Sequence, residues 1–108
     1  MAVRELRGKH VLITGASSGI GRDLAVQLAA AGAELVIAAR RGEKLAELES
    51  EIKANGGVAF TSVADVTLDE DRKKLLAECR NHFGGLDILI NNAALERWGV
   101  LMKPIRSV

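Results

Sequence analysis

The sequence predicts an α/β fold in which helices cover a parallel sheet. Three observations support this class. Short apolar runs alternate with amphipathic segments along most of the chain. The apolar runs show little polar alternation, as expected for strands that are covered on both faces. Each amphipathic segment stops at glycine. An alternation of this kind is typical of parallel strands joined by right-handed crossovers.

The first half of the chain predicts two strands and two helices. Residues 11–13 form the first apolar run, and the helix after it ends at Gly32, which suits a left-handed cap. Residues 35–39 form the second run, and the helix after it stops at residues 55–57. The residues expected to face the core recur at helical spacing. They are Ile20, Leu24, Leu28, Leu45, Leu48 and Ile52.

The second half predicts two more strands with a helix between them. Residues 58–63 form the third strand and residues 86–90 the fourth. Thr67 suits an N-cap, and Glu70 three residues later would complete a capping box. The helix is expected to end at residues 84–85. Its expected core face consists of Leu75, Leu76, Cys79 and Phe83.

Composition limits the possible classes of protein. A length of 108 residues fits one domain, placed here at residues 1–94 with residues 95–108 as an unassigned tail. Lys and Arg number 15 against 14 Asp and Glu, so nothing favours nucleic acid or an anionic membrane as a partner. The single cysteine, Cys79, suits a reducing compartment and is expected to pack inertly. No early apolar run is long enough for a signal peptide or membrane span, so a cytoplasmic protein is expected.

A glycine-rich turn between the first strand and the first helix is the strongest functional signal. Gly15 permits a tight turn, Gly19 lets a pyrophosphate approach the backbone, and Gly21 lets the helix pack close to the sheet. The N–H groups and the dipole at the start of the helix favour an anion there. Ser17 and Ser18 can add hydroxyl donors. The alternative is an ordinary strand-to-helix turn that binds nothing.

The spacing of these glycines resembles the short-chain dehydrogenase/reductase family. Asp65-Val66 follows the third strand, where family members place an acid or asparagine against the adenine. The run Asn91-Asn92-Ala93-Ala94 after the fourth strand resembles the family's Asn-Asn-Ala-Gly motif, with alanine in the last place. The resemblance extends from about Gly8 to Ala94.

This resemblance implies a Rossmann-type fold: four parallel strands in the order 3-2-1-4 with three helices, truncated before a fifth strand. It also implies an oxidoreductase that transfers hydride between a nicotinamide and a carbonyl or alcohol. The implied cofactor-binding residues are Gly15, Ser17, Ser18, Gly19, Ile20, Gly21, Arg40, Asp65, Val66, Asn91, Asn92 and Ala93. Turn-forming asparagines remain the alternative for Asn91 and Asn92. No metal ligands are expected.

The end of the second strand indicates which nicotinamide cofactor is bound. NAD-selective sites place an acid about 20 residues after the glycine turn. Here that acid is absent, and Arg40 stands next to its place. A guanidinium can form a bidentate pair with a 2′-phosphate, so NADP(H) is expected rather than NAD(H). A solvated turn is the alternative for Arg40 and the preferred interpretation for Arg41.

The residues that would carry out the reaction are not found. The resemblance implies a tyrosine, a lysine four residues later and a serine, all beyond the fifth strand, but the sequence has no tyrosine. We therefore expect the chain to be inactive alone. An apolar fourth strand at the sheet edge would favour a homo-oligomer or aggregation. There are two alternatives. The chain is a non-catalytic nucleotide-binding or interaction module, or it is a non-functional truncated gene product. The substrate stays unassigned.

Overall fold

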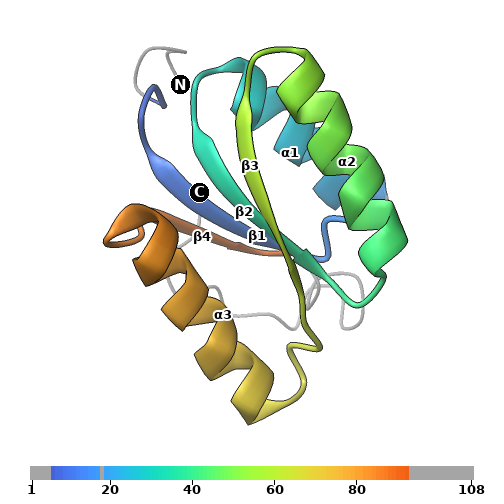
Figure 1. The fold of residues 1–108 in the computed structure, drawn as a ribbon, viewed down its shortest axis with the longest axis vertical. Helices are drawn as coiled ribbons and strands as arrows, with labels where there is room; N and C mark the ends of the chain where they lie inside the picture. Colours follow the sequence, from blue (N-terminus) through green and yellow to red (C-terminus); the bar gives the residue numbers. More distant parts are fainter. Residues whose placement is uncertain (1–5, 18, 93–108) are drawn as a thin grey trace.

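A computed structural model describes residues 6–17 and 19–92, and it shows a sheet with helices on both faces (Figure 1). The four strands are all parallel and lie in the order β3-β2-β1-β4. The predicted fold class and strand order are therefore confirmed. The proposed tail at residues 95–108 lies outside the described residues. The elements are β1 (His10–Thr14), α1 (Gly19–Ala30), β2 (Glu34–Ala39), α2 (Gly42–Ala54), β3 (Val58–Val63), α3 (Asp69–Phe83) and β4 (Ile88–Asn91).

The core has two parts, one on each face of the sheet. Figure 1 shows α1 and α2 together on one face and α3 on the other. Val11 and Ile13 of β1 belong to the cluster under α1 and α2, whereas Leu12 belongs to the cluster under α3. This alternation follows from the two-residue period of a strand. Because both faces of β1 and β2 are covered, these strands need apolar residues at nearly every position.

The two helices on the first face bury most of the residues predicted to face the core. On α2, Leu45, Leu48 and Ile52 are all buried. On α1, Leu28 is buried, but Ile20 is 76% exposed, so its predicted core position is wrong. The line of α1 that faces the sheet runs through residues 21, 25 and 28. Ile20 lies about 100° around the helix from that line and in the first turn.

The start of α3 differs from the prediction. The N-cap residue is Leu68, and its side chain makes no capping bond. Thr67 instead donates its N–H and its hydroxyl to Oδ1 of Asp65, at 2.9 and 2.6 Å. The predicted capping box of Thr67 and Glu70 is therefore wrong: the Thr67 N–H that Glu70 would accept is bonded to Asp65, and Leu68 is the N-cap residue.

The face that α3 turns to the sheet is narrower than predicted. Leu75 and Cys79 are buried and Phe83 is half-buried, but Leu76 is 48% exposed, so its predicted core position is wrong. Among the described residues, α3 is the one helix on this face, so no second helix covers its flank. Burial raises the pKa of the Cys79 thiol to about 11, with a smaller effect from the charge of Glu78. The thiol stays protonated at neutral pH, in agreement with the predicted packing role.

Both histidines contact neighbouring elements at the amino end of the sheet. The His10 ring stacks on Phe83 with 4.4 Å between ring centroids, and its Nε2 lies 3.4 Å from Oε1 of Glu34. The backbone N–H of His10 donates to Oδ2 of Asp87 at 2.9 Å. His82 stacks on Phe60 at 3.9 Å. These contacts join β1, β2, β3 and α3.

The fourth strand lies at one side of the sheet. It was expected over residues 86–90 and is found at Ile88–Asn91. Its hydrogen-bonded neighbour is β1, and within the described ranges no strand pairs with its other side. Ile90 is buried, while Ile88 and Leu89 are half-buried. No helix in the described part of the chain is long and apolar enough to cross a membrane.

We predict that two adjacent leucines of α3 differ sharply in their contribution to stability. Leu75→Ala should lower the free energy of unfolding by about 2–5 kcal/mol, because it removes a buried side chain. Leu76→Ala should change it by less than about 0.5 kcal/mol, because half of that side chain is exposed to water. Urea unfolding followed by circular dichroism measures both. Equal losses would show that Leu76 belongs to the core after all.

Candidate functional site

The four strands end at the same level, and this brings the predicted site residues to one end of the sheet. Thr14 is in register with Ala38 of β2 and with Asn91 of β4, and Ala38 is in register with Ser62 of β3. The segments that follow these strands therefore leave the sheet together. In open α/β sheets, ligands bind at this carboxyl end.

The turn between β1 and α1 has the backbone geometry that its glycines allow. Gly15 and Gly19 have φ angles of 66° and 60°, in the left-handed region that favours glycine. The N–H of the buried Ala16 donates to the carbonyl oxygen of Ala38 at 3.1 Å, which holds the turn against β2. Ser17 is half-buried, and Ser18 lies outside the described residues.

The start of α1 makes this turn electropositive. The helix begins at Gly19, so the first N–H groups of α1 have no partner within the helix. The helix dipole adds partial positive charge at the same place. No acidic residue occurs in the first turn of α1 to offset that charge. The turn can therefore hold an anion such as a pyrophosphate.

Gly21 lies where there is no space for a side chain. A Cβ atom at this position would stand 2.3 Å from the carbonyl oxygen of Gly15 and 2.5 Å from Nδ2 of Asn92. The same Nδ2 donates to the Gly15 carbonyl oxygen at 3.1 Å, and Asn92 is buried. The first turn of α1, the glycine turn and the end of β4 thus meet at one point.

A second link joins the ends of β1 and β4. The hydroxyl of Thr14 donates to Oδ1 of Asn91 at 3.0 Å, and Thr14 is buried. Sequence reasoning named Asn91 and Asn92 but did not single out Thr14 or Ala16. A polar residue at the end of an otherwise apolar strand was the available signal for Thr14. Ala93 lies outside the described residues.

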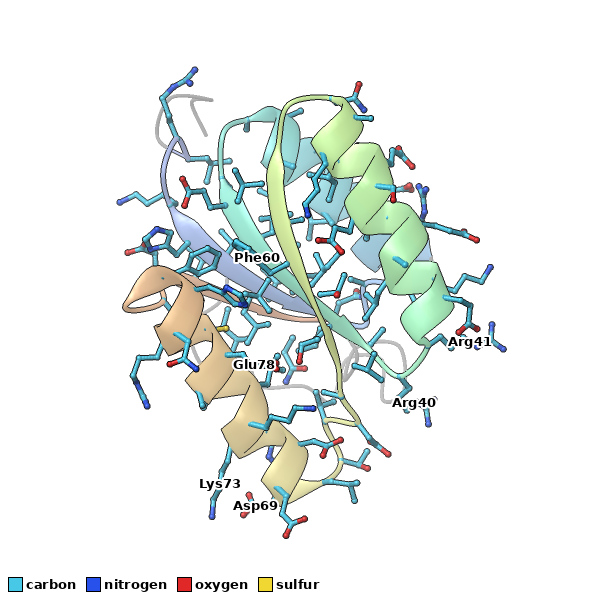
Figure 2. All side chains as sticks on the ribbon, in the orientation of Figure 1. Arg40, Arg41, Phe60, Asp69, Lys73 and Glu78 are labelled. Carbon is cyan, nitrogen blue, oxygen red and sulfur yellow. The ribbon has the colours of Figure 1, made fainter. Side chains whose placement is uncertain are left out.

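Arg40 lies beyond the end of β2, at the start of the connection to α2. Figure 2 shows the labelled side chains of Arg40 and Arg41 at this end of β2, extending away from the sheet. Both residues are exposed, and Arg41 is the N-cap residue of α2. Among the described residues, no carboxylate forms an ion pair with the guanidinium of Arg40. It is therefore available to an anionic ligand at the carboxyl end of the sheet.

The segment that follows β3 is fastened to the first turn of α3. The backbone N–H of Asp65 donates to Oδ2 of Asp71 at 2.7 Å. Arg72 donates from Nη1 to the carbonyl oxygen of Val66 at 2.6 Å. Val66 is half-buried and packs against the cluster under α3. Asp65 and Val66 thus have a defined position at the same end of the sheet as Gly15 and Asn92.

We predict that a methyl group at position 21 disrupts this arrangement. Gly21→Ala should lower the free energy of unfolding by about 1–3 kcal/mol, because the new Cβ overlaps a backbone carbonyl and a buried amide. Gly85→Ala is the matched control, since a Cβ there meets nothing within 4 Å among the described residues. Chemical unfolding compares the two variants. A Gly21→Ala protein as stable as the control would contradict the close approach.

Comparison with known proteins gives a consistent family. The short chain dehydrogenase family matches residues 9–105. An uncharacterized oxidoreductase of Listeria monocytogenes is 47% identical over 90 residues, which cover 83% of this chain and 36% of that protein. An 11-beta-hydroxysteroid dehydrogenase of Sesamum indicum is 46% identical over 92 residues, which cover 84% of this chain and 26% of that protein. The chain thus spans about a third or less of the length of these relatives.

Solved structures show the same similarity. A hydroxysteroid dehydrogenase of Escherichia coli matches with a TM-score of 0.80 and 35% identity, over 82% of this chain and 37% of that one. A 7α-hydroxysteroid dehydrogenase solved with NADH and 7-oxo glycochenodeoxycholic acid matches with a TM-score of 0.78 and 34% identity, over 81% and 34%. Because the family match takes in residues 9–105, the chain belongs to the short chain dehydrogenase family, whose members use a nicotinamide cofactor.

Proposed function

We propose that this chain is the cofactor-binding portion of an oxidoreductase and binds NADP(H) across the carboxyl end of its sheet. The observation that carries this proposal is the meeting of Gly15, Gly21 and Asn92 at the electropositive start of α1. This arrangement leaves backbone donors available where a pyrophosphate would lie. The bound nicotinamide would supply hydride transfer to or from a carbonyl or alcohol.

The remaining predicted residues have proposed roles around that turn. Ser17 and Ser18 would add hydroxyl donors to the pyrophosphate. Ile20 is 76% exposed beside this turn, and a cofactor bound there would contact it. Asp65 and Val66 would lie at the adenine, and Asn91 and Ala93 towards the nicotinamide ribose.

The choice of NADP(H) over NAD(H) rests on Arg40. Relatives of this chain have been solved with NADH and with NAD, so membership of the family does not decide between the two cofactors. In this chain the acid that would accept from the adenosine ribose is absent, and Arg40 is exposed with no ion-pair partner among the described residues. A guanidinium in that place can pair with a 2′-phosphate through two hydrogen bonds.

A second candidate function is a nucleotide-binding module without catalysis. The family resemblance implies a tyrosine as the proton donor, and these 108 residues contain none. Calorimetry with NADPH distinguishes both candidates from a chain that binds nothing. A carbonyl-reduction assay then separates them. For this chain alone we expect binding without reduction.

We predict that Arg40→Asp weakens NADPH binding by about 10- to 150-fold, the value of a lost charge-assisted hydrogen bond. NADH affinity should change far less, because NADH has no 2′-phosphate. Isothermal calorimetry with both cofactors provides the measurement. Arg80→Asp is the control, since it changes the net charge equally from the last turn of α3. Equal losses for NADPH and NADH would remove Arg40 from the 2′-phosphate site.

We also propose that copies of this chain associate through the side of β4 that does not pair with β1. Within the described ranges that side has no strand partner, and the strand is mostly apolar. An unpaired apolar strand is a template for pairing with a second chain. Size-exclusion chromatography with light scattering should therefore give a dimer or larger species. A monomer at micromolar concentration would contradict this expectation.

A further inference from the structure

We propose that Asp71, in the first turn of α3, is a positioning residue for the adenine end of the cofactor and acts through the backbone of Asp65. This inference rests on the proposed function, because it takes Asp65 and Val66 as the place of the adenine. Asp71 itself would not touch the cofactor. Its carboxylate would fix the conformation of the segment that does.

The first support is that the side chain of Asp71 reaches further back along the chain than a residue at its position in a helix ordinarily does. Asp71 is the third residue of α3, and a side chain at that position ordinarily accepts the N–H of the N-cap residue. Here the N–H of the N-cap Leu68 is already bonded to the carbonyl oxygen of Asp65, at 2.9 Å. Oδ2 of Asp71 instead accepts the N–H of Asp65, six residues earlier, at 2.7 Å. An ionised acceptor makes this a strong bond.

The second support is that the bonds of the neighbouring residues in this segment use groups other than the Asp65 N–H. Ala64 donates its N–H to Ala39 on β2 at 2.9 Å, and Arg72 holds the carbonyl oxygen of Val66. Thr67 holds the carboxylate of Asp65 from within the segment. Removing the carboxylate of Asp71 would take away the acceptor of the Asp65 N–H and so loosen the peptide between Ala64 and Asp65.

A purely structural role makes a different prediction. A negative charge in the first turn stabilises a helix through its dipole wherever in that turn it stands. Glu70 carries the same charge one residue earlier and is exposed, with no hydrogen bond or ion pair to residues 64–68. If Asp71 only stabilised the start of α3, Asp71 and Glu70 would affect cofactor binding alike. The positioning role predicts an effect specific to Asp71 and to adenine.

The experiment measures the affinity of the full 108-residue chain for NADPH and for its hypoxanthine analogue, in which a carbonyl replaces the 6-amino group of adenine. Asp71→Ala should weaken NADPH binding about tenfold, the scale of a lost hydrogen bond to a charged group. Binding of the analogue should weaken by less than about threefold, because the analogue has no 6-amino group and already lacks the contact that this group makes. Asp71→Asn keeps an acceptor oxygen and should restore NADPH binding to within about threefold. Glu70→Ala should bind like the wild type.

Hydrogen exchange on the free chain gives a second measurement that needs no ligand. In Asp71→Ala the amide of Asp65 should exchange faster, whereas the amides of Leu75 and Cys79 in the body of α3 keep their protection. If Asp71→Ala does not fold, Asp71→Ser serves in its place, since serine suits the start of a helix but is too short to reach Asp65.

The outcomes separate the two proposals. A wild-type chain that binds neither dinucleotide overturns the proposed function and the role of Asp71 with it. A wild-type chain that binds NADPH, with Asp71→Ala binding equally well, overturns the positioning role alone. Equal losses for NADPH and the hypoxanthine analogue would also overturn it, because they would indicate a general loosening of the site.

Discussion

The close approach of Gly21 to the carbonyl oxygen of Gly15 and the amide of Asn92 is the contact on which the rest of the site depends. It sets how near the first turn of α1 comes to the sheet, and therefore where the N–H groups of that turn point. It also ties the end of β4 to the end of β1. A side chain at residue 21 would separate all three parts at once.

The other segments at the carboxyl end are held in the same way, by bonds to a neighbouring strand. Ala16 is bonded to Ala38 at the end of β2, and Ala64 to Ala39. Thr14 is bonded to Asn91 across β1 and β4. Because these bonds use main-chain groups or buried short side chains, they leave long side chains such as Arg40 free to extend outward. A ligand that bound at this end would meet segments that these bonds already hold in place.

The two ends of the sheet differ in how their charged and aromatic residues are used. At the amino end, His10 contacts Phe83, Glu34 and Asp87, so these side chains satisfy one another. At the carboxyl end, Arg40 has no ion-pair partner among the described residues, and Ile20 is exposed. The charged and aromatic side chains of the amino end are thus paired with one another, whereas at the carboxyl end Arg40 extends outward and Ile20 is exposed (Figure 2).

The sequence by itself determined the order of the strands and helices along the chain, the glycines at which the helices stop and the positions of the candidate site segments. Residues 58–63 form the predicted third strand, and the helix stop at Gly84 is the predicted one, with φ of 78°. These features depend on local residue patterns and on the backbone freedom of glycine, which act within a few positions. The same locality made the glycine turn, Arg40 and the asparagine pair recognisable as candidate site residues.

Only the tertiary structure decided the start of α3, the exposure of Ile20 and Leu76, and the bonds that join β1 to β4. Thr67 could cap a helix, but its N–H and hydroxyl are bonded to Asp65 and Leu68 is the N-cap residue. The sequence spacing of Ile20 and Leu76 places them near the buried face of their helices. Whether each side chain is buried depends on which element covers that side of the helix. Thr14 meets Asn91, and Gly15 meets Asn92, each across a separation of 77 residues. No local pattern encodes such a pairing, because the order and register of the strands create it.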